Sequence, residues 1–306
     1  MPAIVVKNLT KKYGGVIAVN ALTFSVEKGE LFGFIGPDGA GKTSLFRILT
    51  TLLLPDAGEA SVNNLDVVKD YKKLRTQLGY MPGRFSLYQD LSVEENLKFF
   101  ASVFGTTIEE NYDLIKDIYV QIEPFKKRRA GQLSGGMKQK LALSCALIHK
   151  PEILFLDEPT TGVDAVSRKE FWEMLKRLQQ KGITVVVSTP YMDEASLCGR
   201  IALIQNGKIL GIDTPNNIVK TFDKPLLAVK ARNTHALIEA LRKYPHMHSL
   251  YPFGEFLHYT DKRVQFSNDE IHDYLTTEMI QQIEMKPIEP NIEDCFMALM
   301  EKQDHE

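Results

Sequence analysis

The order of apolar and polar positions divides most of the chain into strand-like and helix-like segments. Residues 4–8 (IVVKN) and 16–30 (VIAVNALTFSVEKGE) alternate in the way that is typical of antiparallel strands. Short, almost continuous apolar runs follow, separated mostly by helical spacing, at residues 31–36, 78–81, 152–159, 183–189 and 200–210. Such runs indicate strands buried on both faces. The pattern therefore predicts an α/β core with a mostly parallel sheet, preceded by an N-terminal antiparallel β subdomain.

Residues from about 84 to 150 contain no comparable strand. Three amphipathic segments, 93–105, 108–122 and 134–150, have helical spacing instead. We therefore expect a helical insert within the α/β core.

The register resets around residues 221–226 (TFDKPL), where a charged turn and a proline separate two apolar stretches. Beyond this point the pattern predicts short strands at 226–231, 257–260 and 263–267, and helices at 235–243 and 292–302. The expected domains are a large α/β unit of residues 1–221, which contains the helical insert, and a small α+β unit of residues 222–306.

Composition narrows the class of protein. The 306 residues are 44% hydrophobic and 25% charged, with a formal net charge of −2, so no global field favours nucleic acid or an anionic membrane as main partner. The three cysteines lack zinc-ligand spacing. The N-terminus has no secretory signal pattern, and no run reaches about 18 apolar residues. We expect a protein of the reducing cytoplasm that reaches a membrane only peripherally or through another chain.

The most specific motif is GPDGAGKT, which matches G-x-x-x-x-G-K-[ST] directly after a strand and before a helix. Its glycines let main-chain N–H groups converge on phosphate oxygens at the helix N-terminus. Lys42 is expected to reach the β- and γ-phosphates, and the Thr43 hydroxyl to bind Mg²⁺. A glycine-rich turn that only caps a helix is the alternative. The predicted nucleotide-binding residues here are Gly36, Pro37, Asp38, Gly39, Ala40, Gly41, Lys42, Thr43 and Ser44.

Two acids end the apolar strand ILFLDEP. A phosphate loop needs a carboxylate at the end of a neighbouring strand to hold Mg²⁺ and its water, and Asp157 is in that place. Glu158, one residue further, is placed to polarise the water that attacks the γ-phosphate, so it is the predicted catalytic residue. A solvated strand end is the alternative for both.

LSGGMKQK at residues 133–140 is a second candidate anion site. Ser134 precedes Gly135 and Gly136 and a helical run, an N-cap followed by exposed N–H groups. One nucleotide does not need two such sites in one chain, so this one is expected to serve a nucleotide held by another subunit. An ordinary capped helix is the alternative.

Taken together, GPDGAGKT, LSGGM and ILFLDEP resemble the ATP-binding subunits of ABC transporters over residues 3 to about 220. The resemblance implies a P-loop NTPase fold, ATP and Mg²⁺ as cofactors, and a head-to-tail pair of ATPase domains. In that pair each ATP lies between the phosphate loop of one domain and the LSGG of the other. It implies that Tyr13 stacks on adenine, with a plain strand-face residue as the alternative. It also implies that Asp164 crosses the dimer interface, with a helix N-cap as the alternative.

The chain departs from the family pattern at two positions. Relatives carry a glutamine that contacts Mg²⁺ where this chain has Gly83, and Gln89 lies too far along to replace it. Relatives read roughly STHYMDEA, with a histidine that touches the γ-phosphate, where this chain reads STPYMDEA with Pro190. Proline has no side-chain donor and no N–H. Both departures predict a site that binds ATP but hydrolyses it poorly.

The expected function is therefore that of an ATPase subunit of an ABC-type exporter, in an asymmetric pair with a sister ATPase. Residues 225–302 resemble the extension on subunits of drug-resistance and ABC-2-type exporters. The expected partners are integral membrane subunits, which the family docks near Phe85 to Glu95, although plain loop packing is the alternative there. The resemblance places the protein on the inner face of the cell membrane. Two other functions stay open: a non-hydrolysing regulatory ATP-binding module, and a soluble ABC protein acting on ribosomes or DNA.

Overall fold

A computed structural model describes residues 1–84 and 86–304. Contacts within the chain divide it into two compact units, Met1–Asn216 and Asn217–Glu306. The division falls within helix α7 (Pro215–Lys220), a few residues before the predicted boundary at residue 221.

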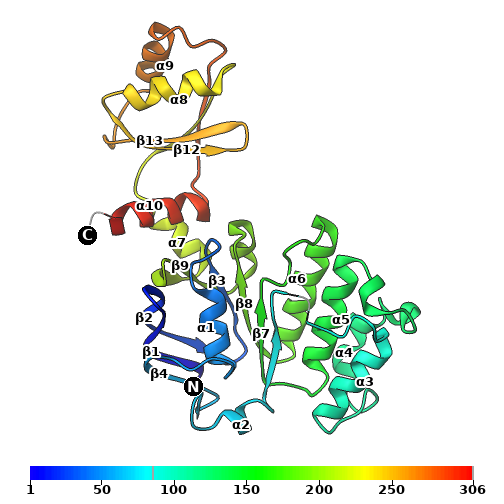
Figure 1. Ribbon diagram of the computed structural model, residues 1–306. Helices are drawn as coiled ribbons and strands as arrows, with labels where there is room; N and C mark the ends of the chain where they lie inside the picture. The colour runs from blue at the N-terminus through cyan, green and yellow to red at the C-terminus, as the bar shows by residue number, and fades with distance from the viewer. Residues whose placement is uncertain (85, 305–306) are drawn as a thin grey trace. The chain divides into compact units, whose positions relative to one another are not determined.

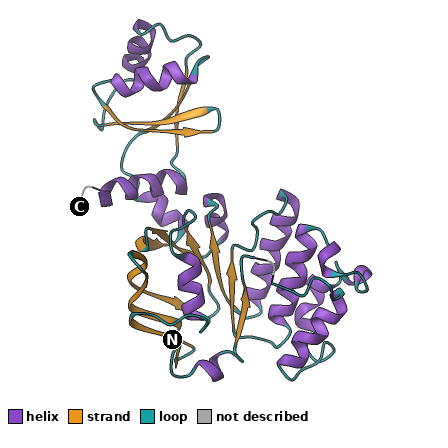
Figure 2. Ribbon diagram, in the orientation of Figure 1, coloured by secondary structure: helices purple, strands orange, loops and turns teal. Residues whose placement is uncertain are grey.

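The first unit is built on two sheets, and its α/β P-loop fold is as predicted (Figures 1 and 2). The central sheet has six strands in the order β10-β9-β3-β8-β7-β6. All neighbours in it are parallel except β9 and β10. Its strands are β3 (Leu31–Ile35), β6 (Leu78–Met81), β7 (Ile153–Asp157), β8 (Thr184–Thr189), β9 (Arg200–Gln205) and β10 (Lys208–Asp213).

The N-terminal subdomain is a four-stranded antiparallel sheet in the order β2-β1-β4-β5. The alternation of residues 4–30 predicted β1 and β2 but not the two strands that complete the sheet. Its strands are β1 (Pro2–Tyr13), β2 (Val16–Glu27), β4 (Ala57–Val62) and β5 (Leu65–Asp66).

The helical insert lies between β6 and β7, and its three predicted helices form. Figure 1 shows them gathered beside the central sheet, away from α1. Ser92 and Glu95 make a reciprocal capping box that fixes the start of the first of them. The unit's helices are α1 (Lys42–Leu49), α2 (Tyr71–Leu74), α3 (Val93–Val103), α4 (Tyr112–Tyr119), α5 (Gly135–Leu147) and α6 (Ala165–Gln180).

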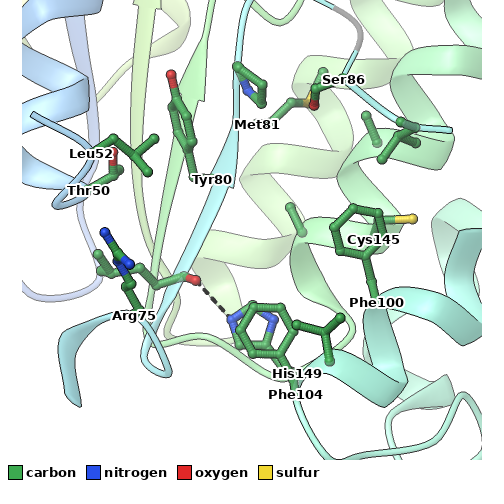
Figure 3. Close-up of a pocket in the computed structure, with 16 residues that line it drawn as sticks. Thr50, Leu52, Arg75, Tyr80, Met81, Ser86, Phe100, Phe104, Cys145 and His149 are labelled. Carbon is green, nitrogen blue, oxygen red and sulfur yellow. Dashed lines mark hydrogen bonds between the residues drawn. The ribbon is translucent and has the colours of Figure 1, made fainter. Parts of the chain in front are cut away.

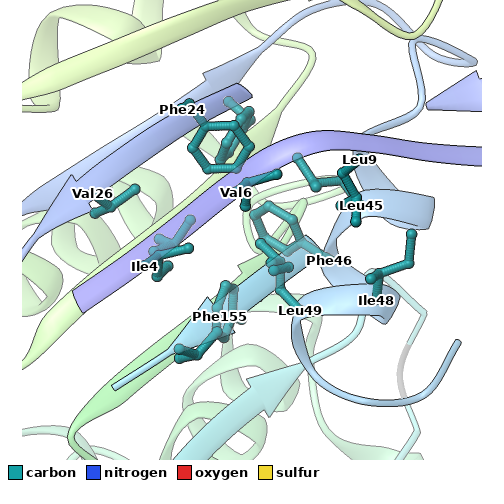
Figure 4. Close-up of a cluster of buried hydrophobic side chains, with 14 of the residues drawn as sticks. Ile4, Val6, Leu9, Phe24, Val26, Leu45, Phe46, Ile48, Leu49 and Phe155 are labelled. Carbon is teal, nitrogen blue, oxygen red and sulfur yellow. The ribbon is translucent and has the colours of Figure 1, made fainter. Parts of the chain in front are cut away.

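The apolar core of the first unit lies where the two sheets meet α1 (Figure 4). The Phe46 ring meets the Phe34 and Phe155 rings edge-on, with centroids 5.9 and 5.6 Å apart. This packing holds α1, and with it the GPDGAGKT loop, against β3 and β7.

One predicted strand is wrong. Residues 200–210 form a hairpin, β9 and β10, and not a single run. Asn206 and Gly207 both have positive φ, 49° and 73°, which is the turn geometry that reverses a two-residue hairpin. The Asn-Gly pair is the sequence signal for this turn.

The second unit alternates as β11-α8-β12-β13-α9-β14, with sheet order β12-β13-β11-β14, a split βαβ arrangement followed by helix α10. The predicted strand at 263–267 is wrong, because Arg263 turns back to Asp261 and Ser267 caps α9. The unit's elements are β11 (Leu226–Lys230), α8 (Thr234–Lys243), β12 (Met247–Phe253), β13 (Phe256–Asp261), α9 (Asn268–Thr277), β14 (Glu284–Ile288) and α10 (Ile292–Asp304).

Within the described residues, no helix has both the length and the apolarity needed to cross a bilayer.

Candidate nucleotide-binding site

The GPDGAGKT segment forms a tight loop between β3 and α1, and two of its glycines are required by space. A Cβ at Gly36 would lie 2.1 Å from the Ile204 carbonyl oxygen, and one at Gly41 would lie 2.0 Å from that of Ala18. Gly41 also has a φ of 102°, which other residues rarely adopt. The Gly207 N–H of the β9–β10 turn donates to the Ala40 carbonyl at 3.0 Å. The loop is therefore fixed from both sides, and its N–H groups begin helix α1.

Lys42 lies across this loop. Its Nζ donates to the carbonyl oxygens of Gly36 at 2.7 Å and Pro37 at 2.9 Å, and is 3.6 Å from Glu158 Oε1. Burial lowers the pKa of Lys42, while Glu158 and Asp157 act in the opposite direction. The ammonium is thus held at the centre of the loop by acceptors that a phosphate could replace. Thr43 and Ser44 follow in the first turn of α1.

Asp157 and Glu158 stand at the carboxyl end of β7, next to β8. Ser188, opposite Asp157 in the parallel register, donates its hydroxyl to Asp157 Oδ1 at 2.6 Å. The Glu158 N–H donates to the Ser188 carbonyl at 2.9 Å, and Glu158 has a φ of 50°. A glutamate in the left-handed backbone region costs conformational energy, and such strained residues are found mainly at functional sites.

These residues fit a magnesium nucleotide. In the described part of the chain, no group of three or more His, Cys, Asp or Glu side chains could hold a metal alone. Mg²⁺ keeps several waters and needs only one or two protein ligands when phosphates supply others. Asp157 Oδ2 has no hydrogen-bond partner among the described side chains, and Asp157 is 2% exposed. Asp157 and Thr43 would hold the ion between loop and strand end, where it would neutralise phosphate charge.

Gly83 and Pro190 flank this pair of acids. A Cβ at Gly83 would lie 3.0 Å from the Asp157 carbonyl oxygen and 3.7 Å from Glu158 Cβ, so a side chain here would grow toward the acids. Pro190 follows Thr189, whose carbonyl accepts the Gly36 N–H at 3.2 Å. Gln89 is elsewhere: its carbonyl accepts the Gly131 N–H of the helical insert at 2.9 Å. Neither departure is compensated by Gln89.

A buried carboxylate beneath the loop was missed by the sequence reasoning. Glu194, 1% exposed, accepts the hydroxyls of Thr160 at 2.7 Å and Thr189 at 2.5 Å. Arg168 Nε lies 3.7 Å from it, and the Arg168 guanidinium covers the Tyr191 ring at 4.4 Å. Glu194 thereby ties the segment before Asp164 to the segment that carries Pro190. The signal was present in the paired acids of YMDEA, but Thr160 and Arg168 lie far from them in the sequence.

The remaining predicted residues divide into two places. Tyr13, 46% exposed, reaches the loop helix, with its hydroxyl 3.3 Å from Ser44 Oγ. Its open ring face beside the loop suits the predicted stacking on a base.

Ser134 caps α5, accepting the Met137 N–H at 3.4 Å, and lies exposed. Gly136 packs against Ser167 of α6, with a Cβ there only 2.9 Å from Ser167 Oγ. Asp164 caps α6, accepting the Ser167 N–H at 3.0 Å, and this bond lowers its pKa. Ser134, Gly135 and Asp164 are exposed, and half-buried Gly136 links the start of α5 to that of α6. Helix α1, which follows the phosphate loop, lies elsewhere, among β1, β2 and β3 (Figure 1).

Comparison with known proteins shows to which family the chain belongs. The ABC transporter family model matches residues 19–161. The linearmycin resistance ATP-binding protein LnrL of Bacillus subtilis is 30% identical over 306 residues, covering 96% of each chain. The chain belongs to the ABC transporter ATP-binding family. This ABC protein is also 42% identical over 214 residues to the probable multidrug ABC transporter ATP-binding protein YbhF of Escherichia coli, covering 69% of the chain but only 37% of YbhF.

One further relative and two solved structures extend the comparison of this ABC protein. The Nod factor export ATP-binding protein I of Burkholderia lata is 36% identical over 218 residues, covering 70% of this chain and 72% of its own. A solved ATP-binding subunit of an ABC transporter superposes with a TM-score of 0.66 at 26% identity, covering 72% of this chain and 93% of the other. The MJ0796 cassette, solved as a dimer in a post-hydrolysis state with ADP and Pi, gives 0.62 at 26% identity, covering 69% and 98%. Family members of this kind bind ATP, and the chain shares their fold.

Proposed function

We propose that this ABC protein binds Mg²⁺-ATP in its own site, hydrolyses it slowly, and works in an asymmetric pair with a sister ATPase that drives an exporter. The observation that carries the proposal is the position of Gly83 and Pro190 on either side of Asp157 and Glu158. Neither Gly83 nor Pro190 has a side chain that could contact the metal, the γ-phosphate or the attacking water.

The expected loss in rate affects hydrolysis but not ATP binding. Losing one preorganised donor to transition-state charge typically costs about 3 to 4 kcal/mol, or roughly 10²- to 10³-fold in rate. Ground-state contacts do not depend on those donors, because the loop N–H groups, Lys42 and Asp157 are intact. ATP affinity is therefore retained while turnover falls.

The LSGG surface supports a role in the partner's site. Ser134 and Gly135 are exposed, the N–H groups after Ser134 begin a helix, and Asp164 lies on the same surface. A nucleotide from a second subunit could bind there even though this chain's own hydrolysis is slow. The dimeric MJ0796 cassette gives this pairing a precedent within the family.

A groove between the sheet and the helical insert is the proposed docking site for a membrane subunit (Figure 3). Its cavity of about 420 Å³ is lined mainly by apolar groups, among them Leu87, Phe100 and Phe104, with Tyr80 on the sheet side. His149 stacks on Phe104 at 3.7 Å and its Nε2 bonds the Leu78 carbonyl at 2.8 Å, so these contacts link the helical insert to the sheet at the groove. An amphipathic helix suits such a groove. Ser86 and Leu87 fall within the predicted contact of residues 85–95, and Phe85 lies outside the described residues.

Export is proposed from the relatives, whose names specify multidrug transport, Nod factor export and linearmycin resistance. Together with membrane subunits, the protein would then work at the inner face of the cell membrane. A regulatory module that binds ATP without any hydrolysis is the second candidate, and the same two positions favour it.

The test is ATP turnover by the purified chain, alone and mixed with the ATP-binding subunit that co-purifies with it from membranes. We expect slow turnover alone and brisk turnover in the mixture, with Ser134→Arg abolishing the gain because it blocks the partner's site. Brisk turnover by the chain alone, lost in Glu158→Gln, would refute the proposal. No gain in the mixture would favour the regulatory module.

A further inference from the structure

A second cavity lies entirely within the C-terminal unit, which the ATP site does not use. Its volume is about 330 Å³. Side chains of β11 and β13 alternate between two faces of the sheet: Leu227 and Tyr259 join the core with α8 and α9. The next residues along each strand, Leu226 and His258, point to the opposite face and line the cavity.

Helix α10 forms the other wall. Asp294, Ala298 and Glu301 line the cavity and follow i, i+4, i+7 spacing, so they share one helix face. The small Ala298 stands between the two acids, where a larger apolar residue would fill the space against the sheet. The hollow therefore results from one small side chain flanked by two carboxylates.

His258 is oriented by one of these acids. Its Nδ1 lies 2.7 Å from Asp294 Oδ1, and its ring stacks on Phe253 at 4.0 Å. Because a carboxylate only accepts, Nδ1 carries the proton in this bond, and in the neutral form of the ring Nε2 presents a lone pair. The described residues give Nε2 no partner, although His258 is only 9% exposed. His258 lines the cavity, so Nε2 is open to a group that binds there.

Glu301 supplies a second acceptor at the wall of the cavity. The Tyr251 hydroxyl donates to Glu301 Oε1 at 2.5 Å, and this bond and burial raise the Tyr251 pKa, with burial the larger cause. Asp294 and Glu301 make ion-pair contacts only with histidines in the described chain. Lys224 and Lys302 also line the cavity, but Lys302 is exposed and Lys224 half-buried, whereas the Asp294 side chain is 3% exposed. Water screens Asp294 less than either lysine, so the part of the cavity beside Asp294 favours positive charge.

We propose that this cavity binds a small organic cation, an ammonium group on an apolar body. The ammonium would donate to His258 Nε2 and the carboxylate of Glu301. The apolar body would lie against Leu226 and the rings of Phe222 and Tyr251, which can also attract the cation through their faces. Phe222 belongs to the segment that directly follows α7, so an occupant would contact the stretch of chain where the second unit begins.

The test is calorimetric titration of the full chain with 2-phenylethylamine, its neutral isostere 2-phenylethanol, and the anion 3-phenylpropionate. We expect the amine to bind, and the alcohol to bind at least about tenfold more weakly, because a charged hydrogen bond is lost. Glu301→Gln keeps an acceptor for Tyr251 but removes the charge, and should weaken amine binding about tenfold. Ala298→Leu fills the hollow, keeps every charge, and should weaken it at least as much.

Glu293→Gln is the matched control, an exposed acid on the same helix outside the cavity, and should leave amine affinity unchanged. Circular dichroism and thermal unfolding check that each variant is folded. Three results would overturn the proposal: tighter binding of 3-phenylpropionate than of the amine, amine affinity unchanged in both Glu301→Gln and Ala298→Leu, or no binding of the amine at all.

Discussion

Positions 83 and 190 lack the side chains that relatives carry there, and restoring both side chains tests the ATP site most directly. The double variant Gly83→Gln/Pro190→His places an amide and an imidazole on either side of Glu158. A Cβ at residue 83 would lie 3.0 Å from the Asp157 carbonyl oxygen, so the loop must move by a few tenths of an ångström. Residue 190 follows the strand end that is bonded to Gly36, so its side chain starts beside the phosphate loop.

Each donor is worth roughly 10²- to 10³-fold in rate when the other parts of the site are in place. Groups that act as a unit are strongly non-additive. We therefore expect Pro190→His alone to raise turnover less than about tenfold, and the double variant to raise it at least about 10²-fold. ATP affinity should change little, because neither position carries the ground-state contacts of Lys42.

The assay is steady-state phosphate release by the purified chain, beside ATP affinity from fluorescence titration. Gly83→Ala/Pro190→Ala is the matched control, since it makes the same backbone changes without adding a donor. Full recovery by Pro190→His alone would show that Gly83 is not a gap. No recovery by the double variant, with ATP affinity intact, would show that these positions do not limit hydrolysis.

Three further predictions follow from single contacts. Gly41→Ala should abolish ATP binding and lower the unfolding midpoint in urea, because its Cβ would lie 2.0 Å from the Ala18 carbonyl oxygen; Gly39→Ala, whose Cβ meets nothing within 4 Å, controls for lost glycine at positive φ. Glu194→Ala should cost about 2 to 4 kcal/mol in urea unfolding, because two buried hydroxyls and Arg168 lose their partner, and Glu194→Gln should cost less because it keeps an acceptor; equal costs would mean that the acceptor kept by glutamine contributes nothing. Burial lowers the pKa of His149 below its ordinary 6.5, so the unfolded chain binds more protons there, and the free energy of unfolding should fall as the pH drops through 6.5. His149→Phe should reduce this dependence in urea melts at pH 5.5 to 7.5, and an unchanged dependence would contradict the prediction.

Much of the fold and of the candidate site could be predicted from the sequence, because the strongest signals depend on residues that are close together in the chain. The GPDGAGKT loop, the acids of β7 and the cap at Ser134 each depend on neighbours in sequence, and the structure places them on the expected elements. The hairpin at Asn206 and Gly207 was missed because its turn was read through as one apolar run.

The contacts that could not be predicted are those that depend on the order of the strands in the sheet. Ser188 reaches Asp157 only because β8 lies beside β7, and Glu194 reaches Thr160 across the same pair of strand ends. Periodicity gives the strands but not their neighbours, so partners on separate strands stayed hidden. The cavity of the second unit was hidden for the same reason: β12 was not predicted, and the Asp294–His258 contact joins α10 to a central strand.

The central claim is that this chain holds ATP without cleaving it quickly, and a single-turnover measurement tests it most directly. The purified chain is loaded with radiolabelled Mg²⁺-ATP, free nucleotide is removed, and the bound ATP and ADP are followed with time, with Glu158→Gln in parallel. The account predicts that most of the bound nucleotide stays as ATP, and that its slow conversion to ADP has a rate close to that in Glu158→Gln. Rapid conversion to ADP that Glu158→Gln abolishes would contradict it.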